Sequence, residues 1–278
     1  MSPSVISSVQ EYSRGMVGGL LFSLPLLYTM EAWWTGFSVR PFALLALVIG
    51  TFILLLGYNF YAGIRYDETW REVVIDSIEE LGLGLLIAAV LLWLLGRISI
   101  DMTLPEIAGK IIVEAMAVAI GVSVGTAHLG GADIDVDDDG EDDTNRPESD
   151  SFSGQLVIAF CGAVLFACNV APTEEVIEIA FESSVWKLLA LALLSLFLGG
   201  VILYYARFVG SERAVRRNAF DVFRGVVIMY AVALVASALM LWFFGRFADL
   251  TPAVCVAQTV VLGVAATLGA SAGRLLMQ

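Results

Sequence analysis

The chain has 278 residues, of which 59% are hydrophobic, and its mean hydropathy is +0.85. Soluble domains are about 45–50% apolar, so this composition excludes a soluble globular protein and indicates a membrane protein. The formal charge of −13, with Lys110 and Lys187 as the only lysines, is typical of high-salt cytoplasm and indicates an extreme halophile. Acidity of this origin says little about partners, and nothing in the sequence suggests nucleic acid.

Eight apolar segments are long enough to cross about 30 Å of hydrocarbon as α-helices. In chain order they cover residues 14–37, 41–62, 74–97, 105–126, 153–177, 184–208, 220–246 and 253–275. The first contains Pro25 and the fifth contains Pro172. An internal proline frees a backbone carbonyl and bends its helix. The sequence therefore predicts an all-α polytopic membrane protein whose first and fifth helices are bent.

The second half of the chain repeats the first. Four residues of the first segment recur 144 positions later: Leu21, Phe22, Thr29 and Glu31 become Leu165, Phe166, Thr173 and Glu175. Each copy carries four helices, and because four is even, both copies cross the membrane in the same direction. We expect residues 1–126 and 153–278 to form two parallel four-helix repeats related by a pseudo-twofold axis along the membrane normal.

An acidic segment, residues 127–152, joins the two repeats and has no apolar periodicity, which predicts a disordered cytoplasmic linker. Asp135–Gly140 is similar to the first half of an EF-hand loop, but the twelfth position holds Arg146 where the loop needs a bidentate Glu. Whether this linker binds cations is left open. Most basic residues lie on the side of the linker, so the positive-inside rule places both termini in the cytoplasm and the chain in the cell membrane.

The duplicated carboxylates are the first candidate site. Glu31 and Glu175 lie inside apolar segments at matched depth, where an acidic side chain is costly. Glu174, Thr29 and Thr173 lie beside them, and carboxylate and hydroxyl oxygens suit a divalent cation or Na⁺. The alternative is that these acids sit at the outer headgroup level and face water.

Glu114 is the second candidate, because it lies about three turns into the fourth segment, near the bilayer centre. It could accept a cation or a proton there. Lys110 precedes it by four residues on the same helix face, so the alternative is an internal Lys110–Glu114 ion pair that fixes helix packing. The matched residue of the second copy is Leu262, so the repeats have diverged at this position.

Two further patterns have a structural and a functional interpretation. Asp76, Glu79 and Glu80 are expected to open the third helix, where acids complement the helix dipole, or else to form an inner vestibule. Gly121–Gly125 and Gly269–Gly273 match G-x-S-x-G, the nucleophile pattern of hydrolases. That pattern needs a strand–turn–helix elbow, so small-residue packing between membrane helices is the better interpretation.

The run PLLYTMEAWW, Pro25–Trp34, resembles the start of an uncharacterised family of integral membrane proteins found in haloarchaea and cyanobacteria. The resemblance covers most of the chain and implies a multi-span membrane protein with a domain of unknown function. It supplies no activity. More distantly, Asn169–Glu174 looks like the Asn…Pro-Glu repeats of cation/Ca²⁺ exchangers, although a residue here separates Pro172 from the acid.

These features predict a cation transporter or channel with a carboxylate-lined site at the interface of the two repeats. The candidate ligands are Glu31, Glu175, Glu174, Thr29, Thr173 and Glu114. The alternative is a non-transporting scaffold that packs on a partner chain through its Gly-rich helices. The sequence shows no nucleophile–base pair that would favour an enzyme. The expected partners are the lipid bilayer and an inorganic cation, and self-association is left open.

Overall fold

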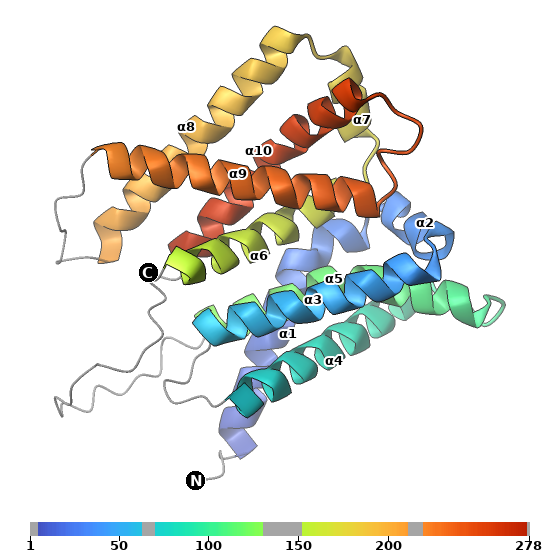
Figure 1. Ribbon diagram of the computed structural model, residues 1–278. Coiled ribbons are helices and arrows are strands. Elements are labelled where there is room, and N and C mark those ends of the chain that lie inside the picture. Colours follow the sequence, from blue (N-terminus) through green and yellow to red (C-terminus); the bar gives the residue numbers. More distant parts are fainter. Residues whose placement is uncertain (1–4, 63–69, 130–151, 211–218, 277–278) are drawn as a thin grey trace, which may run out of the picture.

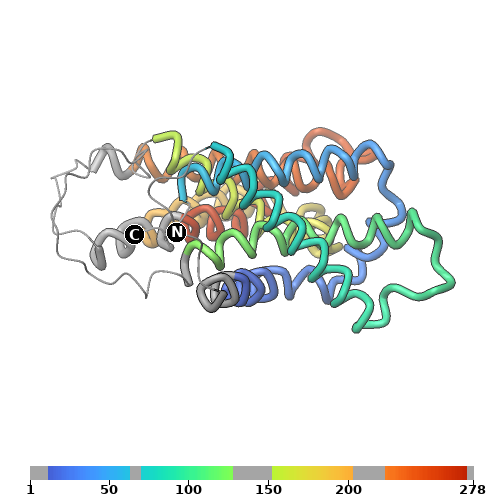
Figure 2. Tube along the Cα trace, turned by 90° about the horizontal axis from the view of Figure 1, so that it is seen from below, coloured from blue at the N-terminus to red at the C-terminus, as the bar shows by residue number. Residues whose placement is uncertain are grey.

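A computed structural model describes residues 5–62, 70–129, 152–210 and 219–276, and all regular structure within these ranges is helical (Figure 1). The ten helices of these ranges are α1 (Val5–Leu27), α2 (Met30–Ser38), α3 (Pro41–Ala62), α4 (Trp70–Leu94), α5 (Leu104–Leu129), α6 (Phe152–Val170), α7 (Glu175–Glu182), α8 (Val185–Gly210), α9 (Ala219–Phe243) and α10 (Pro252–Leu276). Figure 2 shows that α1 begins and α10 ends at the same end of the bundle, which we call the terminal end.

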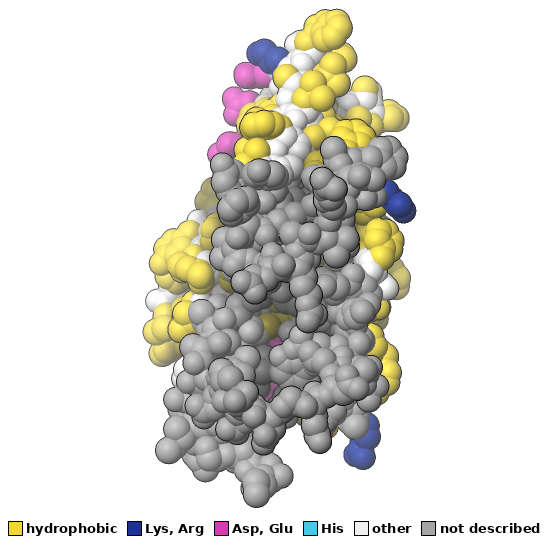
Figure 3. Space-filling model, turned by 90° about the vertical axis from the view of Figure 1, so that its left-hand side faces the viewer, with side chains coloured by type: hydrophobic (Ala, Val, Ile, Leu, Met, Phe, Trp, Pro, Cys, Tyr) yellow, Lys and Arg dark blue, Asp and Glu magenta, His cyan; other side chains and the backbone are white. Residues whose placement is uncertain are grey.

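The helices confirm the expected class of polytopic membrane protein. Seven of them, α3, α4, α5, α6, α8, α9 and α10, are long and apolar enough to cross a membrane over the described residues. The pair α1 and α2 makes up to eight if it is counted as one bent span. Large apolar side chains are exposed on the flanks of the bundle (Figure 3). A surface of this kind is stable in lipid and not in water.

Two spans are broken at matched places. The first turns by 87° between α1 and α2, three residues after Pro25, which confirms the predicted bend. In the second half, α6 ends at Val170, and the short helix α7 begins after Pro172. Proline lacks the N–H that continues the helical ladder, so each break follows from the sequence.

Glycines let the first helix of each half approach the last one closely. The glycines at these contacts lie at matched positions: Gly18, Gly121 and Gly125 in the first half, and Gly162, Gly269 and Gly273 in the second. A Cβ atom on Gly18 would lie 2.5 Å from the Cα of Gly125, so no larger residue fits there without movement. The G-x-S-x-G runs thus serve helix packing between α1 and α5 and between α6 and α10, as predicted.

The spans α4 and α9 end in the same way. Gly96 and Gly245 adopt positive φ values of 67° and 71° directly after these helices. The next residue donates its N–H back over five residues, Arg97 to the carbonyl of Leu92 and Arg246 to that of Leu241. This is the Schellman arrangement, and glycine takes the left-handed position without a Cβ penalty.

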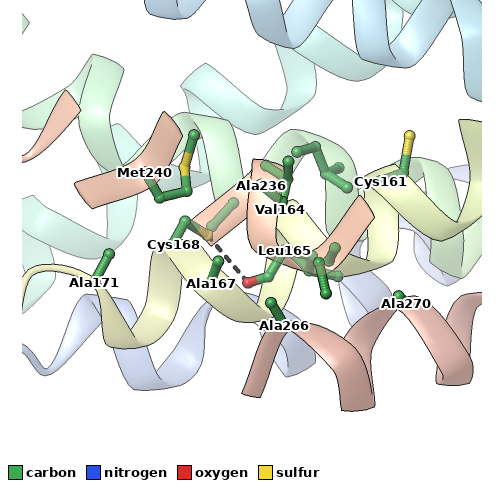
Figure 4. Packing of buried hydrophobic residues seen from close by; sticks show 14 of the residues in the cluster. Cys161, Val164, Leu165, Ala167, Cys168, Ala171, Ala236, Met240, Ala266 and Ala270 are labelled. Atoms are coloured by element: carbon green, nitrogen blue, oxygen red, sulfur yellow. Dashed lines mark hydrogen bonds between the residues drawn. The ribbon is translucent and has the colours of Figure 1, made fainter. Parts of the chain in front are cut away.

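Helix α6 carries the core between the two halves. It packs against α9 and α10 of its own half and contacts α1, α3 and α5 of the first half. Small residues such as Ala167 and Cys168 are fully buried on it, and Ala236 of α9 and Ala266 of α10 lie around them (Figure 4). Burial also separates lipid-facing from central helices, because 78% of the α5 span is buried and only 11% of the α8 span.

Candidate functional site

Glu114 is the most deeply buried acidic side chain that the structure describes. It lies in α5, its exposure is 0%, and neither carboxylate oxygen has a hydrogen-bond partner within the described ranges. Its neighbours on the helix, Val113 and Ala115, are buried as well. An ionised carboxylate at such a place loses its hydration and gains nothing in return, which makes it the most costly group among the residues that the structure describes.

Lys110 does not compensate Glu114. Its ammonium group donates to the carbonyl of Arg97 at 2.9 Å and lies 3.6 Å from the sulfur of Met102. Lys110 therefore holds the loop that follows α4. It lies one helical turn from Glu114, toward the end of the bundle opposite the termini. The ion-pair interpretation of Lys110 and Glu114 is not what the geometry shows, since both oxygens of Glu114 stay unpaired.

Glu114 lies near α6. The thiol of Cys168 on α6 lies within electrostatic range of the Glu114 carboxyl group. That thiol donates to the carbonyl of Leu165 in its own helix at 3.1 Å (Figure 4). The next residue, Asn169, reaches across to α1. The candidate site is therefore the junction of α1, α5 and α6, with Glu114 as its only acidic member that the described contacts reveal.

Asn169 clamps α1 just before its break with two hydrogen bonds. Its Oδ1 accepts the N–H of Leu26 at 2.9 Å, and its Nδ2 donates to the carbonyl of Phe22 at 3.0 Å. These are the two groups that an unbroken helix would pair with each other. Nδ2 also donates to the carbonyl of Leu165 at 2.7 Å. A side chain from the second half thus binds both backbone groups of one rung of the α1 ladder.

The duplicated residues of the first break lie at the start of α2. Glu31 is in its first turn and is half-buried, and Thr29 is the N-cap residue. The hydroxyl of Thr29 donates to the carbonyl of Pro25 at 2.7 Å. That carbonyl is among those that the end of α1 leaves without a helical partner.

The second break is similar but more open. Glu174 is the N-cap of α7 and Glu175 lies in its first turn, and both side chains are exposed. Thr173 donates its hydroxyl to the carbonyl of Val170 at 2.9 Å, so both threonines bind the end of the preceding helix. Within the described part of the chain, no group of three or more His, Cys, Asp or Glu side chains could hold a metal ion.

The predicted six-residue metal site is consequently not assembled around one point. No three of the four acids Glu31, Glu114, Glu174 and Glu175 are close enough to share an ion. The reason is packing: α2 lies on α5, whereas α7 lies on α10. A site that uses Glu31 and Glu175 alone stays a prediction.

A second polar network lies nearer the terminal end, between α3, α4 and α5. Asn59 donates through Nδ2 to the hydroxyl of Ser77 at 3.1 Å and to the carboxylate of Glu80 at 2.8 Å. Ser123 donates to Oδ1 of Asn59 at 2.9 Å. Asn59, Ser77 and Ser123 are all buried, and Glu80 is partly exposed.

This network corrects the expectation for the acids of α4. The helix begins at Trp70, not near residue 74, so Asp76, Glu79 and Glu80 lie in its second and third turns and not at its start. They cannot act as first-turn caps, and Glu72 occupies that position. Glu79 is exposed and accepts a hydrogen bond from Tyr12 of α1 at 3.0 Å.

Asn59 was not among the residues singled out from the sequence, and Asn169 was noted only for its distant likeness to the exchanger repeats. Both are amides inside apolar spans. Polar side chains are rare in such spans and need hydrogen-bond partners there, so their presence in the sequence is a usable signal of a polar site. The acidic segment 130–151, including the EF-hand-like run, lies outside the described residues.

The chain as a whole matches one known family. Residues 11–277 match the family described as "Putative integral membrane protein (DUF2391)". Comparison with curated proteins and with solved structures gave no significant match. The match spans both halves and agrees with seven to eight apolar helices, so the chain belongs to the DUF2391 family of integral membrane proteins.

Proposed function

We propose that this protein moves protons across its membrane and that Glu114 is the intramembrane proton acceptor. The observation that carries this proposal is the full burial of the Glu114 carboxyl group without any hydrogen-bond partner in the described structure. An acid at the centre of a membrane helix costs about 2.5–3.5 kcal/mol on insertion scales. A residue that costs this much and fixes no contact needs a functional reason.

The geometry favours a proton over a metal ion at Glu114. Ca²⁺ takes about 6–8 oxygen ligands, and Mg²⁺ also demands a full octahedral shell. The described neighbourhood of Glu114 is apolar apart from the Cys168 thiol, and no metal-binding group of three side chains is present in it. One carboxylate suffices for a proton, because a single O–H bond removes the charge.

The broken helices support transport independently. Discontinuous helices whose ends surround a polar centre are common in secondary transporters. Here the α1 break adjoins α6 through Asn169, and Glu114 lies near the same helix. Glu31, Glu174 and Glu175, with Thr29 and Thr173, line the two breaks, and we assign to them the attraction of cations at the outer mouth.

Two matched sets of contacts support the parallel two-repeat arrangement as part of this proposal. The helix pairs α1–α5 and α6–α10 use equivalent glycines, and α4 and α9 end in equivalent glycine caps. An even number of crossings per half agrees with both termini in the cytoplasm of a halophile's cell. The scaffold alternative relied on free Gly-rich faces, but α1 and α6 of the same chain cover these glycines.

Chemical labelling in the membrane tests the proposal without a known substrate. Dicyclohexylcarbodiimide enters bilayers and forms a stable adduct with protonated carboxyl groups only. We expect one adduct on Glu114 in the wild type, its loss in Glu114→Gln, and its retention in Glu178→Gln, which changes an exposed acid of α7. The adduct is located by mass spectrometry of the purified protein.

The functional arm uses sealed vesicles of phosphatidylethanolamine and phosphatidylglycerol with an internal pH dye and a valinomycin-driven K⁺ potential. In vesicles with the wild type or Glu178→Gln, the luminal pH should fall or rise according to the sign of the imposed potential. In vesicles with Glu114→Gln, the luminal pH should change no faster than in vesicles without protein. An unlabelled Glu114, or equal proton flux in wild type and Glu114→Gln, refutes the assignment.

A further inference from the structure

We propose that Glu80, held by the amide of Asn59, is a second proton-exchange site, through which protons pass between Glu114 and the terminal end of the bundle. This inference rests on the proposed function and adds the route by which protons reach one side. At this site the Glu80 carboxylate takes a proton from hydronium, which leaves water and forms one O–H bond, and later gives the proton back to a water molecule, which becomes hydronium.

The position of Glu80 suits an entry from the terminal end. Its neighbour Glu79 is bonded by Tyr12, which lies only two turns into α1, so this part of α4 is level with the beginning of α1. Asn59 lies in the last turn of α3, and Ser123 lies two turns before the end of α5. Glu80 itself is partly exposed, whereas the groups that hold it are buried.

The hydrogen bonds of the network link three helices to this carboxylate. Ser123 of α5 donates to Asn59 of α3, and Asn59 donates to both Ser77 and Glu80 of α4. Ser77 also donates to the carbonyl of Val73, which fixes its hydroxyl. A buried amide that is fully satisfied in this way pre-positions the carboxylate and adds no mobile group of its own.

The ionisable groups near Glu80 that the structure describes come from three helices. On α3, Tyr58 lies within electrostatic range of it, and on α4, Asp76 lies one turn earlier on the same face. Helix α1 packs on α4 and contributes Tyr12 and Arg14 at this level. Ser123 and Glu114 are nine residues apart on α5, roughly 13 Å of helix, so transfer between the two acids needs water or a movement of the helices.

The second half of the chain lacks this network. The residues at the positions of Asn59, Ser77 and Glu80 are Leu203, Val222 and Gly225, and Leu262 replaces Glu114. Only Ser123 has a serine counterpart, Ser271, which is buried and has no partner within the described residues. Glu114 and Glu80, the two acids of the proposed route, therefore both belong to the first half, and this route runs through α3, α4 and α5.

The test compares Glu80→Gln with Glu79→Gln in the vesicle assay described above. The two variants remove adjacent acids of the same helix, of which only Glu80 is held by the network. We expect Glu80→Gln to slow the flux strongly, Glu79→Gln to leave it close to wild type, and both to keep the carbodiimide adduct on Glu114. Equal flux in the two variants overturns the inference.

A second variant keeps the inference testable if Glu80→Gln does not fold. Asn59→Leu installs the residue that the second half carries at the matched position and removes the donors to Glu80 while the acid remains. Its flux should fall toward that of Glu80→Gln with Glu114 still labelled, and wild-type flux in Asn59→Leu contradicts the role of the network. If Glu114→Gln retains the proton flux of the wild type, the proposed function fails. If Glu114→Gln loses the flux but Glu80→Gln retains it, only the second proton-exchange site is refuted.

Discussion

Removal of the Asn169 clamp is the sharpest structural test, because one side chain holds a break in the opposite half of the chain. Asn169→Ala deletes two hydrogen bonds to α1, those to Leu26 and Phe22, and one within α6. Interhelical hydrogen bonds in membrane proteins contribute about 0.6 kcal/mol on average and at most about 1.7 kcal/mol. Two such bonds predict a loss of about 1–3 kcal/mol in the free energy of unfolding.

The loss should not exceed this range, because the N–H of Leu26 and the carbonyl of Phe22 can pair with each other once the amide is gone. The assay is a reversible unfolding titration with dodecyl sulfate in mixed micelles, followed by tryptophan fluorescence. Ser237→Ala is the matched control, since that buried hydroxyl bonds only to the carbonyl of Ala233 in its own helix. If Asn169→Ala and Ser237→Ala have equal stabilities, the clamp is not what holds the break.

The remaining predictions concern glycines and use the same titration. Gly18→Ala places a Cβ 2.5 Å from the Cα of Gly125 and should cost about 1–3 kcal/mol through overpacking. Gly82→Ala meets no atom within 4 Å and should instead stabilise α4 by about 0.5–1 kcal/mol, so the reverse order of these two variants contradicts the packing. Gly96→Ala forces a Cβ into a backbone with φ of 67° and should cost about 1–2 kcal/mol, although space around it is open. Gly225→Ala, open but helical, is its control and should not destabilise.

Several features of the fold could be predicted from residues alone. The length of each apolar run determines whether it can span a membrane, because hydrocarbon cannot satisfy an open backbone. Pro25 and Pro172 lack the N–H that continues a helix, so the places of the breaks are local properties of the chain. The glycines of α5 and α10, Gly121, Gly125, Gly269 and Gly273, were identified as packing positions because small residues at regular spacing have few other uses in a membrane helix.

The start of α4 was misplaced because hydropathy locates the apolar part of a helix and not its first turn. Residues 70–73, which include the charged Arg71 and Glu72, were left outside the predicted helix, yet the helix already runs through them. That error made Glu80 look like a cap. Side-chain partners from α3 and α5 show instead that it belongs to a buried network.

The arrangement of the acids is a property of the tertiary structure. Spacing placed Lys110 and Glu114 on one helix face, but the loop after α4 offers Lys110 a carbonyl and leaves Glu114 unpaired. Likewise, Glu31 and Glu175 repeat perfectly in the sequence, while the separate packing of α2 on α5 and of α7 on α10 keeps three acids from meeting. Local chemistry determines where a helix starts, bends and ends. Which groups then meet depends on how helices distant in sequence pack, and no periodicity within one helix encodes that.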